Sequence, residues 1–174
     1  ANYTPLSPIT FLTRTAFIHP QRTSIIQGER HWTWAETYIR CCRLASALTQ
    51  RGIGKGDTVS VMAPNIPAIF EAHFGVLMTG AVLNTINIRL EAEILSYIFE
   101  HAETKVLLTD REFSSVIKQA LSKVKQNILV IDINDPETES DELLGETEYE
   151  DFLEEGDPEF EAIFPEEDWQ SVSL

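Results

Sequence analysis

The sequence predicts an α/β fold, with a parallel-centred sheet and helices on both faces. Short apolar runs rich in β-branched residues recur near Val61, Leu83, Leu107 and Val130, roughly 23 residues apart. Each interval also holds a segment with apolar residues every three or four positions, as in an amphipathic helix. The runs are apolar throughout rather than alternating, which is typical of strands buried on both faces. Strand, helix and strand repeated at this spacing indicate a parallel sheet.

The amino-terminal part is expected to form a helix and a hairpin. Ser7 can cap a helix over Pro8–His19, because proline at the first helical position lacks only an N–H that would be unpaired there. Ser24–Gln27 and Glu29–Trp32 have strand composition on either side of a glycine, which predicts a short hairpin. The inward side of the helix is predicted to carry Ile9, Leu12, Ala16 and Phe17.

A second helix is predicted to begin with a capping box. Thr33 and Glu36 have the T-x-x-E spacing in which each side chain bonds the other's backbone N–H. Cys41 and Cys42 are adjacent on this helix and point about 100° apart, so we expect two reduced thiols, one of them half-buried, rather than a disulfide. The helix should end near Gln50 and bury Trp34, Ile39, Leu44, Ala45 and Leu48.

The glycines of Arg51–Asp57 are interpreted as turn residues. A phosphate-binding loop follows a strand and opens a helix, so that the helix N-terminus faces the phosphate. This segment follows a helix and precedes a strand, and it lacks both the Gly-Lys-Ser/Thr ending and the G-x-G-x-x-G spacing.

The central unit, Gly56–Leu90, is predicted to form strand, helix and strand. Thr58–Ala63 is the first strand; Asn65 is the expected cap of the helix, with proline in the first turn. Gly80 follows the helix at the position where a residue in the left-handed conformation often ends it. Ala81–Ile86 supplies the second strand. The buried helix face is predicted to hold Ile66, Ile69, Phe70, Phe74, Leu77 and Met78.

Four further elements are expected before residue 134, in the order helix, strand, helix, strand. They span Leu90–Ala102, Lys105–Thr109, Glu112–Lys125 and Asn127–Ile133. The first of these helices should turn Ile94, Leu95, Ile98 and Phe99 inward, and the second Phe113, Val116, Ile117, Ala120, Leu121 and Val124.

Charge is unevenly distributed, with a net value of −15. All 13 Lys and Arg lie in residues 1–133, whereas residues 134–174 contain 17 of the 28 acids. Such a block argues against nucleic acid or an anionic membrane as partner. Asn134–Gly145 is expected to be an exposed, mobile loop, Glu148–Glu155 a short helix, and Trp169–Leu174 the start of a strand. No apolar run approaches the roughly 18 residues that span a bilayer.

Few residues could carry chemistry. His73 lies on the central helix, and the other histidines, His19, His31 and His101, lie at element ends. Asp110 ends a strand, as a phosphoacceptor aspartate would. A receiver domain also needs an acidic pair after its first strand, where this chain has Met62-Ala63-Pro64. We therefore assign no catalytic, cofactor-binding or metal-binding residue.

Two motifs resemble the first subdomain of acyl-CoA synthetases and related adenylate-forming ligases. Trp32-Thr33-Trp34-Ala35-Glu36-Thr37-Tyr38 resembles the family's L-T-Y-x-E-L motif, and PNIPAIFEAHFGVLMTGAVLNTINIRL resembles its P-N-x-P turn, helix, G-A and N-P strand end. The proline of the last element is absent from Asn84–Asn87. The whole chain can be aligned with the start of such an enzyme, most like the plant acyl-activating enzymes that act on short or aromatic acids.

The resemblance implies a truncated part of a ligase that joins a carboxylic acid to AMP and then to coenzyme A, using ATP and Mg²⁺. The family's phosphate-binding motif, S/T-S-G-T-T-G-x-P-K-G, is missing, as are all later motifs. We therefore expect no ligase activity from this chain alone. The expected organisation within a partial AMP-binding domain, 1–174, is helix, hairpin and helix in 1–54, a βαβαβαβ core in 55–133, and an acidic loop plus the start of another element in 134–174.

Two other functions stay open. One is a non-catalytic α/β module that binds a partner through its acidic carboxyl end. The other is a small-ligand domain of the flavodoxin or nucleotide-binding type, with the ligand at the carboxyl ends of strands near Ala63-Pro64-Asn65 and Thr109-Asp110. The resemblance implies an intracellular protein, peroxisomal or cytoplasmic.

Overall fold

A five-stranded parallel sheet forms the centre of the protein. The computed structural model describes residues 7–136 and 142–164. The strand order is β4-β3-β5-β6-β7 and every neighbouring pair is parallel, as predicted. The strands are β3 (Thr58–Met62), β4 (Val82–Thr85), β5 (Thr104–Asp110), β6 (Leu129–Ile133) and the two-residue β7 (Thr147–Glu148).

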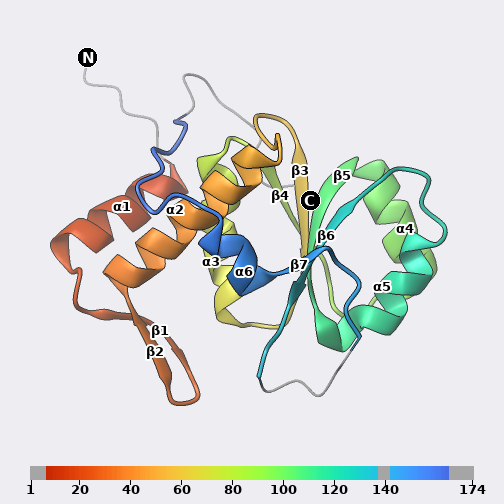
Figure 1. Ribbon diagram of the computed structural model, residues 1–174, viewed down its shortest axis with the longest axis horizontal. Helices are drawn as coiled ribbons and strands as arrows, with labels where there is room; N and C mark the ends of the chain where they lie inside the picture. The colour runs from red at the N-terminus through yellow and green to blue at the C-terminus, as the bar shows by residue number, and fades with distance from the viewer. Residues whose placement is uncertain (1–6, 137–141, 165–174) are drawn as a thin grey trace.

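Helices cover both faces of this sheet (Figure 1). One face packs against α2 (Trp34–Gln50), α3 (Pro67–Met78) and α6 (Tyr149–Glu154), with α1 (Pro8–Ile18) beside them. The other face packs against α4 (Ala92–His101) and α5 (Ser114–Leu121), which follows the 3-10 turn η1 (Arg111–Phe113). Two apolar cores result, one on each side of the sheet. Among the described residues, no helix combines the length and apolar character needed to cross a membrane.

The chain reverses direction across the sheet after its first strand. β3 is followed by β4 on one side, and the connection through α4 then crosses to β5 on the other side of β3. α3 lies on one face and α4 and α5 on the other, as this reversal requires. In such sheets, ligands bind outside the carboxyl ends of the strands at the point of reversal. A ligand site is therefore expected at the carboxyl ends of β3, β5 and β6.

The hairpin forms a separate sheet. β1 (Thr23–Gln27) and β2 (Arg30–Thr33) pair only with each other and project beyond the main body (Figure 1). Its turn contains Gly28, whose φ of 56° is the left-handed conformation that favours glycine.

The predicted helix ends are mostly confirmed. The side chain of Ser7 accepts a hydrogen bond from the N–H of Ile9 at 3.3 Å. Thr33 and Glu36 form the capping box, each accepting from the other's backbone N–H. Asn65 is not the cap of α3: Ile66 takes that position without a side-chain bond, and its N–H donates to Pro64 O at 2.8 Å.

Three predicted core residues are exposed instead. Phe17 is 87%, Ile39 41% and Ile94 48% exposed. A helix touches its neighbours along a narrow stripe, which Ile9, Leu12 and Ala16 already fill in α1. Phe17 follows Ala16 by one position and so points about 100° away from that stripe.

The predicted buried face of α3 is also wrong in part. The tightly packed face consists of small residues, Ala68, Ala72, Gly75 and Val76, whereas Ile69, Phe70 and Phe74 are only half-buried. Small residues allow α2 to approach closely: a Cβ on Gly75 would lie 2.7 Å from Leu44 Cδ2 and 3.0 Å from Cys41 O. Because α3 is apolar nearly all round, periodicity could not identify which side faces α2.

Several boundaries differ by a few residues. The helix predicted over Glu112–Lys125 is split into η1 and α5, and the predicted helix over Glu148–Glu155 is confirmed as α6. In the segment predicted to be an exposed loop, residues 137–141 lie outside the described residues; Asp135 at its start is buried, and Asp132 accepts from the N–H groups of Leu144 and Gly145 near its end. The strand predicted over Trp169–Leu174 also lies outside the described residues.

Candidate functional site at the carboxyl edge of the sheet

An apolar groove lies between the hairpin and α3, next to the carboxyl end of β3. It encloses about 600 Å³, within the roughly 300–1,000 Å³ typical of ligand pockets. The half-buried aromatic side of α3 forms one wall, with Phe70 and Phe74 in edge-to-face contact at 5.3 Å between ring centroids. Strand β1 forms the other wall. The lining consists of Ser24, Ile25, Ile26, Gln27, Asn65, Ile66, Pro67, Ile69, Phe70, His73 and Phe74.

His73 is the titratable side chain in this groove. It is exposed, and its Nδ1 lies 2.7 Å from the carbonyl oxygen of Ile69 in the same helix. Since a carbonyl oxygen can only accept, Nδ1 is the donor in this contact. No acid or nucleophile bonds to this ring in the described part of the chain. The groove is therefore suited to binding a ligand rather than to reacting with it.

A second, smaller hollow of about 40 Å³ lies where β6 ends, and its lining mixes polar and apolar side chains. The buried carboxylate of Asp135 accepts both bonds from Gln27 Nε2, at 2.9 and 3.1 Å, and Arg30 lies 3.6 Å away. The guanidinium of Arg30 also lies 5.4 Å from the ring centroid of Trp32. These contacts tie the hairpin to the end of β6, and this hollow has room for only a few waters.

Beside this hollow, a half-buried arginine joins two carboxylates. Arg40 Nε donates to Glu71 at 2.5 Å, and its two terminal nitrogens donate to Glu150 at 2.8 and 2.7 Å. Tyr149 donates its hydroxyl to Glu71 at 2.8 Å. We call these four residues the Arg40 cluster. It connects α2, α3 and α6.

The protonation of the Arg40 cluster follows from its burial. Burial raises the pKa of Glu71 above its ordinary 4.5, and Arg40 and Tyr149 oppose that shift. Burial alone would lower the pKa of Arg40, but Glu150 and Glu71 together hold it above its ordinary value. Burial also raises the pKa of Tyr149 well above 10.0, so the phenol stays neutral and can donate. The cluster therefore joins three helices through paired charges, and its net contribution to stability depends on how far these pairs offset the cost of burying them.

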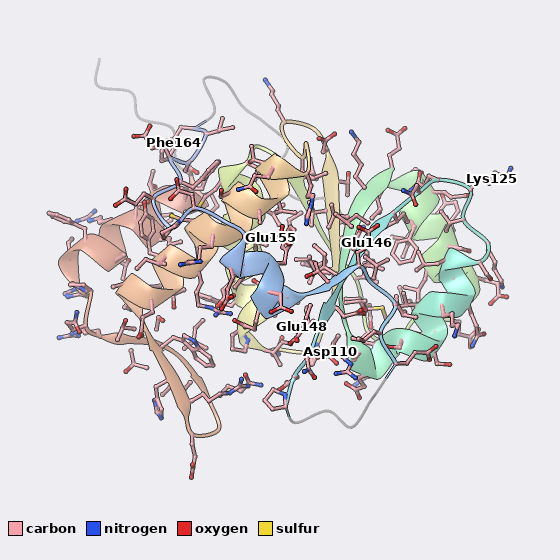
Figure 2. All side chains as sticks on the ribbon, viewed as in Figure 1. Asp110, Lys125, Glu146, Glu148, Glu155 and Phe164 are labelled. Carbon is pink, nitrogen blue, oxygen red and sulfur yellow. The ribbon has the colours of Figure 1, made fainter. Side chains whose placement is uncertain are left out.

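Asp110 has a structural role. It lies at the carboxyl end of β5, at the lower edge of the sheet in Figure 2. Its Oδ1 accepts from the N–H of Glu112 at 2.8 Å and so caps η1. The other histidines, His19, His31 and His101, are exposed, and the ring of His101 stacks on Tyr97.

The two cysteines and the glycine turn are also accounted for by packing. Cys41 and Cys42 are free thiols, and both are fully buried, so the expectation that one is half-buried was wrong. Gly52 and Gly56 have φ of 77° and 83°, which suits a turn between α2 and β3 rather than a phosphate loop. Within residues 7–136 and 142–164, no three His, Cys, Asp or Glu side chains are grouped so as to hold a metal ion.

Sequence reasoning named Ala63-Pro64-Asn65 as one possible ligand position, and the groove lies beside it, but the hairpin wall of the groove and the Arg40 cluster were missed. The groove arises between β1 and α3, which are far apart in sequence, and no local pattern encodes that contact. The cluster had one signal: Glu71 is the sole carboxylate in helix α3, whose other residues except His73 are apolar. A charge in such a position requires a buried partner.

The chain is similar to known proteins along its whole length. Residues 12–168 match the family model described as AMP-binding enzyme. The chain is 48% identical to acetate–CoA ligase CCL3 of Humulus lupulus, covering 100% of the chain and 33% of that relative. It is 46% identical to the peroxisomal acetate/butyrate–CoA ligase AAE7 of Arabidopsis thaliana and 42% identical to the peroxisomal trans-cinnamate:CoA ligase of Petunia hybrida, each with 100% and 33% coverage.

Solved structures support the fold. The crystal structure of the anthranilate CoA ligase AuaEII in complex with anthranoyl-AMP matches 94% of this chain and 29% of that chain, with a TM-score of 0.80 and 20% identity. A benzoate CoA ligase from Burkholderia xenovorans matches with a TM-score of 0.76, covering 88% and 29%. The chain thus spans about a third of the length of the curated relatives it matches.

Proposed function

Because this chain belongs to the AMP-binding enzyme family, we propose that it is the first lobe of an ATP-dependent carboxylic acid–CoA ligase. The observation that carries the proposal is relatedness along the entire chain to proteins named as acid–CoA ligases. The reaction would convert an acid, ATP and coenzyme A into acyl-CoA, AMP and pyrophosphate, through an acyl-AMP intermediate.

Within such an enzyme, this lobe would supply binding surface rather than reacting groups. The groove between β1 and α3 offers aromatic and aliphatic walls next to the carboxyl ends of the strands, where ligands of parallel sheets bind. The ATP phosphates need a loop of small residues whose N–H groups can approach them, and the 174 residues contain no S/T-S-G-T-T-G segment. No described residue is assigned to Mg²⁺.

The proposed substrate class is a short or aromatic carboxylic acid. The relatives are named for acetate, butyrate, benzoate and trans-cinnamate. Several of them are named as peroxisomal, and a peroxisomal or cytoplasmic location belongs to the same proposal.

The test is an assay of acyl-CoA formation by the protein encoded by the complete parent transcript. It is run with acetate, butyrate, benzoate and cinnamate in turn, with ATP, Mg²⁺ and coenzyme A. We expect acid-dependent release of AMP and pyrophosphate for at least one acid, and none from the 174-residue chain. Acyl-AMP formed by the isolated chain would contradict its expected inactivity, and a complete protein that forms no acyl-CoA from any acid would contradict the ligase assignment.

A further inference from the structure

Residues 149–163 cross the outer face of α2 as a strap. The segment begins with α6, which follows the edge strand β7, and ends beside the carboxyl end of α3. Figure 2 shows α6 lying over α2 with Glu155 at its end, and the chain continuing towards Phe164. The first turns bury Tyr149, Phe152 and Leu153 in the core on this side of the sheet.

Beyond its apolar residues, the strap is held mainly by side chains of α2 and of Arg51, which caps the end of that helix. Arg43 donates to Leu153 O at 3.5 Å, Gln50 donates to Glu155 O at 3.2 Å, and Arg51 pairs with the Glu155 carboxylate at 2.7 Å. One backbone bond to another element is present: the N–H of Ile163 donates to Met78 O at 2.8 Å. The strap therefore has little of the backbone ladder that makes a segment unfold together with the sheet.

The Arg40 cluster differs from these contacts in burial. Glu71 is 0% exposed and Arg40 19%, whereas Glu150, Arg51 and Glu155 are 59%, 36% and 41% exposed. The strap therefore meets the pair of Arg40 and Glu71 through one exposed carboxylate, that of Glu150, and through the buried hydroxyl of Tyr149, which donates to Glu71. An exposed pair of this kind contributes little, but removing one partner of a buried pair leaves a charge without compensation. The planar guanidinium holds Glu71 of α3 with one edge and Glu150 of the strap with the other.

We propose that residues 149–163 open as a unit separate from the sheet, and that Arg40 is the latch that keeps the strap closed. Opening separates Glu150 from Arg40, removes the hydroxyl of Tyr149 from Glu71, and uncovers the apolar surface of α2 beneath Phe152 and Leu153. Arg40 and Glu71 stay paired with each other, since both lie on helices that remain packed. The position of the strap thus determines how much of the apolar surface of α2 is exposed.

Hydrogen exchange of the 174-residue chain, followed by mass spectrometry, tests this proposal. Exchange is compared between peptides from the strap and peptides from β5, whose central residues are fully buried. The decisive variant is Arg40→Met with Glu71→Gln, because it leaves no buried charge and the new amide oxygen can still accept the hydroxyl of Tyr149. Arg40→Met alone is the more severe variant, and Lys105→Met, which breaks the pair between exposed Lys105 and half-buried Asp57, is the control.

In the double variant we expect strap amides to exchange about tenfold faster or more, the factor that 1.4 kcal/mol gives, while β5 amides stay within about twofold of the unmodified chain. In Arg40→Met alone, the strap should exchange faster still. The control should leave the strap unchanged. Equal acceleration of strap and β5 in the double variant, or a strap as protected as in the unmodified chain, would overturn the proposal. So would faster strap exchange in Lys105→Met.

Discussion

The carboxylate of Glu71 lies 2.5 Å from Nε of Arg40, in the interface between α3 and α2, and it has no exposed surface. Two opposing effects act on this carboxylate. Burial favours its neutral form, whereas the guanidinium and the hydroxyl of Tyr149 favour the ionised form. Burial is the larger effect, so the pKa of Glu71 lies above its ordinary value. The sign of this shift can be measured.

The contribution of Glu71 to stability should grow as the pH falls. Between its unfolded pKa, near 4.5, and its raised folded pKa, the native state binds more protons than the unfolded chain. The free energy of unfolding then rises with falling pH. We compare the chain with Glu71→Gln, which cannot titrate, by urea unfolding from about pH 7 towards 4.5. The difference, unmodified minus variant, should increase over that range; a decrease would mean that ion pairing outweighs burial.

Gly156 should be intolerant of any side chain. A Cβ there would lie 2.0 Å from the backbone oxygen of Arg43 in α2, which cannot move without disrupting the helix. We expect Gly156→Ala to lower the free energy of unfolding by about 1–3 kcal/mol. The matched control is Gly54→Ala, where nothing lies within 4 Å of the added atom and a gain of roughly 0.4–1 kcal/mol is expected. Equal stability of the two variants would contradict the packing of the strap on α2.

Cys41 and Cys42 should be inert in the native protein. Both are buried, and burial raises the pKa of each thiol, well above 9.0 for Cys41. Because the thiolate is the reactive form, modification requires the fold to open first. A thiol reagent such as Ellman's should show almost no reaction with the native chain and two equivalents in denaturant. Rapid modification of either cysteine under native conditions would show that α2 is accessible.

The elements of the sheet could be predicted because their signals are local. Apolar β-branched runs marked β3, β4, β5 and β6, and the T-x-x-E spacing of Thr33 and Glu36 marked the start of α2. In the acidic carboxyl part, charge was a poorer guide to burial. Tyr149, Phe152 and Leu153 are spaced to bury one side of a helix whose other side is acidic. The strap is therefore part of the fold despite its composition.

The position of the candidate site beside Asn65 was among the predicted alternatives, but its walls could not be predicted, because they depend on which sides of the elements meet. α3 offered apolar residues on nearly every side, and close packing between Gly75 and Leu44 decided that its aromatic side would face the hairpin. The partner of Glu71 was equally hidden, since Arg40 lies 31 residues earlier in the chain. Contacts of this range follow from the three-dimensional fold rather than from periodicity.

The central claim is that this chain supplies the first lobe of an acid–CoA ligase and contains none of its phosphate chemistry. It is tested most directly by replacing the corresponding third of the acetate–CoA ligase of Humulus lupulus with these 174 residues, at 48% identity, and measuring acetate-dependent ATP–pyrophosphate exchange. The chimera should exchange, while the relative without that third and the isolated chain should not. A correctly folded chimera with no exchange, or exchange by the isolated chain, would contradict the claim.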